Sequence, residues 1–122
     1  MTSNKSQVEF FFDCSSPWTY LAFIEILKLS SRQNLNIIWK PILVGGVFNL
    51  VNQDVYEFRK KPNPKKLTYS NNDLRLWSKL RGININFPKV FPVNSVKAMR
   101  GCLFAQKENE LVKYALNIFQ AY

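Results

Sequence analysis

The chain has 122 residues, 47% of them apolar and 15% aromatic, so it forms at most one domain with a substantial core. It contains no histidine, which excludes a Ser-His-Asp or Cys-His mechanism and a histidine-ligated metal site within this chain. A net charge of +9 favours anionic partners, namely nucleic acid, acidic membranes or small carboxylates.

The two cysteines and the lengths of the apolar runs indicate the cellular compartment of the protein. No run approaches the roughly 20 apolar residues of a membrane-spanning helix, and the polar start MTSNKSQ lacks the apolar region of a signal peptide. Cys14 and Cys102 match no CxxC or zinc-ligand spacing, so we expect buried, unpaired thiols and no metal site. We therefore expect a cytoplasmic protein.

The stretch Gln7–Leu21 is the most informative part of the chain. Its apolar run at residues 7–12 predicts a strand buried on both faces. Ser16 is a favourable helix N-cap and Pro17 suits the first helical position, so a helix is predicted over residues 17–32. The Ser16 hydroxyl would then lie at the tip of a strand and at the positive end of a helix, where an anion is stabilised.

A second strand is predicted over residues 35–40, before Pro41. Strand, helix and strand joined by a tight return form a βαβ unit, whose strands are parallel. The helix of this unit has an apolar inner face at helical spacing. The residues of this face are Tyr20, Phe23, Ile24 and Leu27.

The rest of the chain is predicted to be helical and irregular. Pro41–Asp54 is expected to form a loop with one short helical turn, and residues 57–66 a basic, proline-broken connector. Helices and one irregular segment follow, supported by caps and by apolar residues at helical spacing. They are a helix at 64–80 with Leu67, Leu74, Trp77 and Leu80; an irregular segment at 83–93; a helix capped by Asn94 or Ser95 with Val96, Met99 and Leu103 on one face; and a helix from about Asn109 that buries Leu111, Ala115, Ile118 and Phe119.

A sheet of two parallel strands is too small to be stable alone, because three or more strands or extensive helix cover are normally needed. Either the strand at residues 7–12 pairs with something outside this chain, or the chain is a piece of a longer protein. We expect the second.

Short motifs recur in a fixed order along nearly the whole chain. They are F-x-D-x-x-S-P at residues 11–17, P-x-L-x-G-G-V-F at 41–48, the pair Asn52-Gln53, K-x-x-Y-x-x-x-D-L-x-x-W at 66–77 and F-P-x-N-S-x-x-A-M-R at 91–100. Together they resemble the kappa-class glutathione transferases and the 2-hydroxychromene-2-carboxylate isomerases, in the DsbA-like branch of the thioredoxin fold.

The resemblance implies an α/β fold. Residues 1–44 would be the N-terminal βαβ half of a thioredoxin-like (DsbA/kappa) fold, and residues 45–122 an all-helical insertion. The C-terminal thioredoxin half, which other members of the family have, would be absent.

The resemblance implies glutathione as the cofactor and Ser16 as the catalytic residue that hydrogen-bonds its sulfur. Redox members of this fold have Cys-x-x-Cys where this chain has Ser16 and Thr19, so thiol–disulfide exchange is lost. A serine hydroxyl without a base is a poor nucleophile, but it can donate to a thiolate while the helix end favours negative charge. Lowering a thiol pKa by one unit takes only about 1.4 kcal/mol.

The resemblance places Pro17, Lys40, Asn52 and Gln53 in the glutathione or substrate site as well. Lys40, at the end of the second strand, would meet a substrate carboxylate; the alternative is an ordinary surface lysine. Asn52 lies one position closer than the usual family spacing, so Gln53 can take its place.

The implied activity is a glutathione-dependent cis–trans isomerisation of the 2-hydroxychromene-2-carboxylate type, in aromatic degradation. A kappa-type glutathione transferase is the alternative. The alternative of another class is a non-catalytic basic binding module that uses Arg59–Lys66, or an inactive fragment. The expected partners are glutathione and a small anionic aromatic substrate, in a homodimer and without nucleic acid or membrane.

Overall fold

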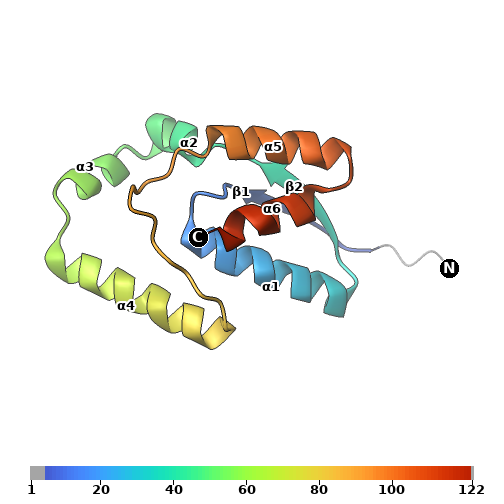
Figure 1. Cartoon of the computed structure of the whole chain (residues 1–122), viewed down its shortest axis with the longest axis horizontal. Coiled ribbons are helices and arrows are strands. Elements are labelled where there is room, and N and C mark those ends of the chain that lie inside the picture. Colours follow the sequence, from blue (N-terminus) through green and yellow to red (C-terminus); the bar gives the residue numbers. More distant parts are fainter. Residues whose placement is uncertain (1–4, 122) are drawn as a thin grey trace.

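The computed structural model describes residues 5–121 and begins with the predicted βαβ unit (Figure 1). Strands β1 (Gln7–Phe12) and β2 (Asn36–Pro41) are parallel neighbours on either side of helix α1 (Pro17–Gln33) in the chain. Their register runs from Gln7 opposite Asn36 to Phe12 opposite Pro41. Helices follow: α2 (Val44–Val51), α3 (Asp54–Lys60), α4 (Pro64–Arg81), α5 (Val96–Lys107) and α6 (Leu111–Gln120).

Helix α1 begins at the predicted residue and extends one residue beyond the predicted end. Ser16 is the N-cap, and its side chain accepts a hydrogen bond from the backbone N–H of Thr19, while Pro17 takes the first helical position. At the other end, Asn34 adopts a left-handed conformation with a φ of 52°, which ends the helix and turns the chain toward β2.

An aromatic cluster joins the sheet to α1 and α6. The rings of Phe23 and Trp39 are 4.8 Å apart, those of Phe23 and Phe119 are 5.2 Å apart, and Tyr20 stacks on Phe119 at 5.1 Å. Phe12, Phe23 and Phe119 are almost wholly buried. Figure 1 shows α1 and α6 side by side in front of the strands. The aromatic contacts therefore fix the positions of these two helices on the sheet.

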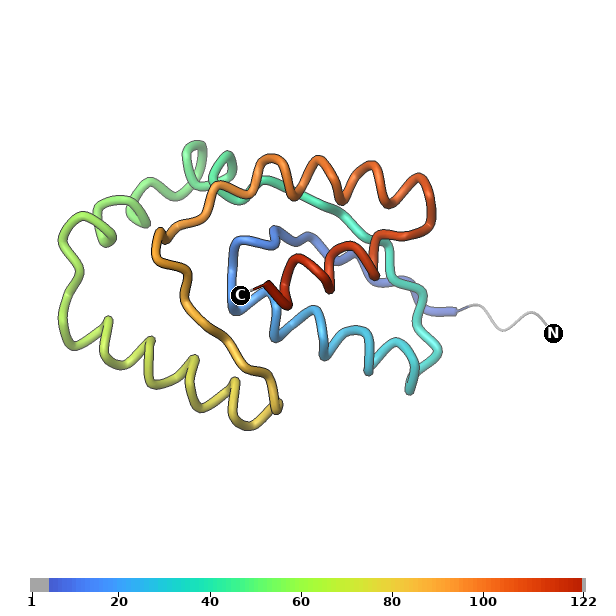
Figure 2. Tube along the Cα trace, in the orientation of Figure 1, coloured from blue at the N-terminus to red at the C-terminus, as the bar shows by residue number. Residues whose placement is uncertain are grey.

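Helices α5 and α6 complete the core. Met99 and Cys102 of α5 and Ala115 of α6 are buried in the same cluster as Phe12. Gly101 lets α6 approach, because a Cβ there would collide with the Tyr114 side chain. The tube in Figure 2 brings the end of α6 back beside the start of α1.

The opposite face of the sheet is open in the described part of the chain, and this corrects one prediction. Burial alternates along β1, and Phe11 is 58% exposed. On the same face, Lys40 forms an ion pair with Glu9 at 3.4 Å. The apolar run predicted a strand buried on both faces, but α1, α5 and α6 cover only the face of Phe10 and Phe12.

Two further predictions were wrong in the middle of the chain. Residues 44–51 form helix α2 rather than a loop with a single turn, because the carboxylate of Asp13 accepts the Val44 N–H and so caps this helix from a distance. Most of the predicted connector is helical too. In α3, acidic Asp54 and Glu57 lie in the first turn and basic residues in the last, which complements the helix dipole.

Helix α4 and the segment after it agree with the predicted boundaries. The Asn63 side chain caps α4 by accepting from the Lys65 and Lys66 N–H groups, and Gly82 ends it with a φ of 65°. The predicted irregular segment follows, with a cis peptide bond at Phe91–Pro92.

Burial of the predicted apolar positions is less complete than the sequence indicates. In α4 only Leu74 is buried, and Leu103 of α5 is 49% exposed; Ile118 of α6 is only partly buried. Among the described residues, no helix combines the length and apolar character needed to cross a membrane.

Candidate functional site

A cleft of about 380 Å³ lies at the carboxyl end of β1. The end of this strand and the first turn of α1 form its base, and residues of α2, α3, α4 and the irregular segment form its walls. Most of the lining side chains are apolar or aromatic. The aromatic ones are Phe11, Phe12, Trp18, Phe48, Phe87 and Phe91.

Ser16 supplies the hydroxyl at the base of this cleft. It is half-buried, and its Oγ accepts the Thr19 N–H at 3.3 Å. No acceptor within residues 5–121 receives the hydroxyl proton. Because Pro17 has no N–H, the amides of Trp18 and Thr19 are the first donors of α1. The Ser16 hydroxyl can therefore donate to an anion that also feels the positive end of the helix.

Asp13 holds the segments of the cleft together. Its side chain is buried and accepts hydrogen bonds of 2.9 Å from the Ser15 N–H, the Val44 N–H and the Ser95 hydroxyl. These donors belong to the turn before α1, to the start of α2 and to the N-cap of α5. With three of its roughly four lone-pair sites occupied by protein donors, the carboxylate acts as a structural anchor.

Arg59 is the cation among the described residues that line the cleft. It lies on α3, and its guanidinium carbon is 5.9 Å from the ring centroids of both Phe48 and Tyr56. A second hollow of about 340 Å³ adjoins the cleft. Tyr56 lines this second hollow, and Arg59 lines both.

The structure brings some of the predicted site residues together and not others. Ser16 and Pro17 line the cleft, but Lys40, Asn52 and Gln53 do not. Lys40 pairs with Glu9 on the open face of the sheet. Asn52 ends α2, and the Gln53 side chain donates to the backbone carbonyl of Asn49 at 3.2 Å.

The two cysteines lie together beneath the site, buried and unbridged as predicted. The pKa of the Cys14 thiol is raised, because it is hydrogen-bonded to Cys102 and because burial disfavours the thiolate. The Cys14 backbone N–H points at the sulfur of Met99 at 3.2 Å. Cys14 is thus a core residue and not the nucleophile of the cleft.

The sequence did not identify two residues of the site. The sequence places Arg59 in a basic connector, although its spacing of three from Tyr56 would put the two side chains on one helical face. Asp13 stands out in the sequence only as part of a motif, since nothing there reveals its partners 31 and 82 residues away. A larger hollow of about 650 Å³ lies along α4, lined by Arg75 and Lys79, and does not include Ser16.

Comparison with known proteins gives consistent matches. Residues 7–122 match the family of DSBA-like thioredoxin domains. The chain is 32% identical over 103 residues to glutathione S-transferase kappa 1 of Homo sapiens, covering 82% of this chain and 42% of that protein. It is 29% identical over 120 residues to 2-hydroxychromene-2-carboxylate isomerase of Pseudomonas putida, covering 93% of this chain and 54% of that protein.

A solved structure of a 2-hydroxychromene-2-carboxylate isomerase resembles this one, with a TM-score of 0.73 at 29% identity. The match covers 94% of this chain and 55% of that one. The chain therefore spans about half the length of the curated relatives it matches. These matches confirm the predicted resemblance and the predicted partial DsbA-like thioredoxin fold of mixed α/β type.

Proposed function

Because the chain belongs to the family of DSBA-like thioredoxin domains, we propose that it takes part in glutathione-dependent chemistry, in which Ser16 holds the glutathione thiolate. The observation that carries this proposal is the Ser16 hydroxyl at the first turn of α1, which opens on an aromatic-lined cleft and keeps its proton free among the described residues. Relatives named as a glutathione transferase and an isomerase support the choice of chemistry.

The thiolate needs stabilisation rather than a base. The hydroxyl proton of Ser16 donates to the sulfur, and the helix end contributes roughly 0.3–1 kcal/mol toward the same negative charge. A hydrogen bond to a charged group adds about 1.5–3 kcal/mol. The sum exceeds the roughly 1.4 kcal/mol that lowers a thiol pKa by one unit. Ser16 thus raises the fraction of nucleophilic thiolate at neutral pH without itself exchanging a proton.

In the proposed isomerisation, the thiolate adds to a conjugated carbon of a small anionic aromatic substrate. The double bond becomes a single bond, the adduct rotates about it, and the electron pair then returns to expel the same thiolate. Glutathione is therefore unchanged at the end, and cis geometry becomes trans. The aromatic side chains of the cleft, Trp18 and Phe48 among them, would hold the ring of the substrate by stacking.

A transferase is the second candidate. It rests on the match to glutathione S-transferase kappa 1, and it differs in that the glutathione adduct is released rather than broken down. The match to the isomerase covers more of this chain, 93% against 82%, so we place isomerisation first.

Contacts of Lys40, Asn52 and Gln53 with glutathione or substrate remain proposals. A homodimer is proposed as well. It is supported by the edge of β1 that has no partner strand within the described part of the chain, since such an edge favours pairing with another copy.

A glutathione titration by calorimetry tests the proposed function. Ser16→Gly removes the hydroxyl, yet costs the helix only a few tenths of a kcal/mol in capping, so lost binding would not reflect lost folding. We expect the dissociation constant to rise about tenfold in this variant, as the loss of one charge-assisted hydrogen bond implies. Ser16→Thr keeps the hydroxyl and should bind more tightly than Ser16→Gly.

The matched control is Asn63→Gly, which replaces the side-chain cap of α4 in the same way. It should bind glutathione like the wild type. Equal binding by wild type and Ser16→Gly would remove Ser16 from the site, and steeply salt-dependent binding to DNA in place of glutathione would favour the basic module.

A further inference from the structure

The cleft that contains Ser16 has one unassigned charged group. Among its described lining residues, the charged ones are Asp13 and Arg59. Asp13 is occupied by three hydrogen bonds from protein groups. Arg59 is therefore the side chain that decides which charge the cleft accepts.

Arg59 lies beside two aromatic rings and is not neutralised by an acidic side chain of the described residues. Its guanidinium lies 5.9 Å from the rings of Phe48 and Tyr56, within the range of a cation–π interaction. The Tyr56 hydroxyl donates to the Gly45 carbonyl at 3.1 Å, which fixes one of these rings.

The guanidinium has no carboxylate partner within residues 5–121. The neighbouring acid Glu57 pairs with Lys60 at 3.0 Å instead, and Arg59 is exposed and donates no hydrogen bond to another described residue. Its planar set of N–H donors matches the two oxygens of a carboxylate. An oriented, unpaired guanidinium in an aromatic-lined cleft is a site for an organic acid.

We propose that Arg59 binds the carboxylate of the ligand that occupies the Ser16 cleft. This rests on the proposed function for the position of the sulfur, but the Arg59 contact itself does not require glutathione. The carboxylate has two possible sources, the glycine end of glutathione or the aromatic substrate. Lys40, for which the sequence predicts contact with a substrate carboxylate, lies outside this cleft and pairs with Glu9.

The test, on the full chain, compares each acid with an analogue in which the carboxylate in question is blocked. One pair is glutathione and its glycine ethyl ester, and the other is 2-naphthoate and 2-naphthamide, each titrated by calorimetry. The variants are Arg59→Gln, which removes the charge, and Arg59→Lys, which keeps it without the planar fork. Lys61→Gln is the control, because Lys61 is exposed, ends the same helix and lies outside the cleft.

In the wild type, we expect the acid of one pair to bind about tenfold more tightly than its blocked analogue. Arg59→Gln should lose this preference, Arg59→Lys should keep part of it, and Lys61→Gln should match the wild type. The pair that shows the effect identifies the source of the carboxylate.

The possible failures are distinguishable. If Arg59→Gln keeps the acid preference in both pairs while Ser16→Gly still weakens glutathione binding, the Arg59 assignment is wrong and the proposed function stands. If 2-naphthoate binds through Arg59 but glutathione does not bind, the proposed function fails and the Arg59 site remains. If the wild type binds neither acid, both are overturned.

Discussion

Asp13 shows how a single residue can build a site without taking part in its chemistry. Its carboxylate receives the Ser15 N–H on one oxygen, and the Val44 N–H and the Ser95 hydroxyl on the other, each at 2.9 Å. Because the carboxylate is buried, water cannot take its place as the acceptor for these donors. The position of the first turn of α1, and so of Ser16, depends on this carboxylate.

We predict that Asp13→Asn lowers the free energy of unfolding by about 2–3 kcal/mol. An amide has one oxygen, so whichever way it turns, its NH₂ group faces an N–H donor. Ser95→Ala removes a single hydrogen bond and should cost about 1 kcal/mol. Urea denaturation measures both values.

The control is Glu108→Gln, an exposed charge change at the end of α5, which should stay within about 0.5 kcal/mol of the wild type. An Asp13→Asn protein as stable as this control would show that the carboxylate is not the anchor of the cleft.

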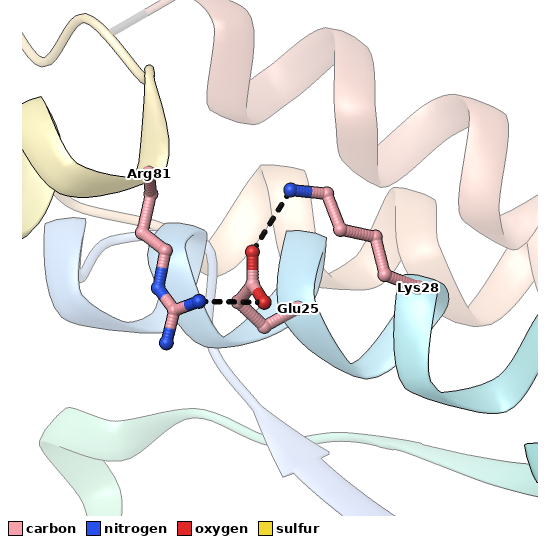
Figure 3. A network of polar contacts seen from close by, with 3 residues as sticks. All are labelled: Glu25, Lys28 and Arg81. Atoms are coloured by element: carbon pink, nitrogen blue, oxygen red, sulfur yellow. Dashed lines mark hydrogen bonds and ion pairs between the residues drawn. The ribbon is translucent and has the colours of Figure 1, made fainter. Parts of the chain in front are cut away.

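Among the elements, a surface ion pair joins α1 and α4. Figure 3 shows Glu25 of α1 between Lys28 of its own helix and Arg81 at the end of α4, each at 2.9 Å. The guanidinium of Arg81 also lies over the Trp77 ring, 5.4 Å from its centroid. The hydrogen bond to Lys28 and the positive charges nearby lower the pKa of Glu25 below its ordinary value of 4.5.

The ion pairs of Glu25 with Lys28 and Arg81 predict a pH dependence of folding stability. A lowered folded-state pKa means that the stabilisation is fully present above pH 4.5 and is lost as the pH falls through the folded-state value. Wild type should therefore be more stable than Glu25→Gln at neutral pH, and the two should converge in acid. Glu57→Gln is the control, because the exposed Glu57–Lys60 pair lies within one helix and joins no second element. Parallel pH profiles for wild type and Glu25→Gln would contradict this.

The helices and strands also show which parts of the fold can be predicted from the sequence. Local signals predicted β1, α1 and β2, and Ser16 and Pro17 set the start of α1 with their own backbone and side chains. Helix α2 was missed because the group that caps it, Asp13, belongs to another segment. The open face of β1 was missed because an apolar run predicts burial, whereas burial depends on which helices cover the sheet.

The candidate site was predictable to the same degree. Ser16 could be found, because a helix N-cap after a buried strand is a local pattern. Arg59 could not, because its place in the cleft depends on how α3 packs beside α2 and on the Phe48 and Tyr56 rings. Contacts between elements carry no signature in a single sequence.

At the scale of the whole molecule, the chain is a βαβ unit whose one covered face carries α1, α5 and α6. It spans about half the length of the curated relatives it matches. Its cleft nevertheless combines a hydroxyl at a helix end, a guanidinium and aromatic walls within this chain alone. These are sufficient, in our proposal, to bind glutathione and stabilise its thiolate.

The most direct measurement is the thiol pKa of glutathione bound to this chain, followed by the ultraviolet absorbance of the thiolate as the pH rises. We predict that the wild type lowers this pKa by at least one unit relative to free glutathione, where one unit corresponds to about 1.4 kcal/mol, and that Ser16→Gly abolishes most of the shift. An identical thiol pKa for free glutathione and for glutathione bound to the wild type would contradict the role of Ser16.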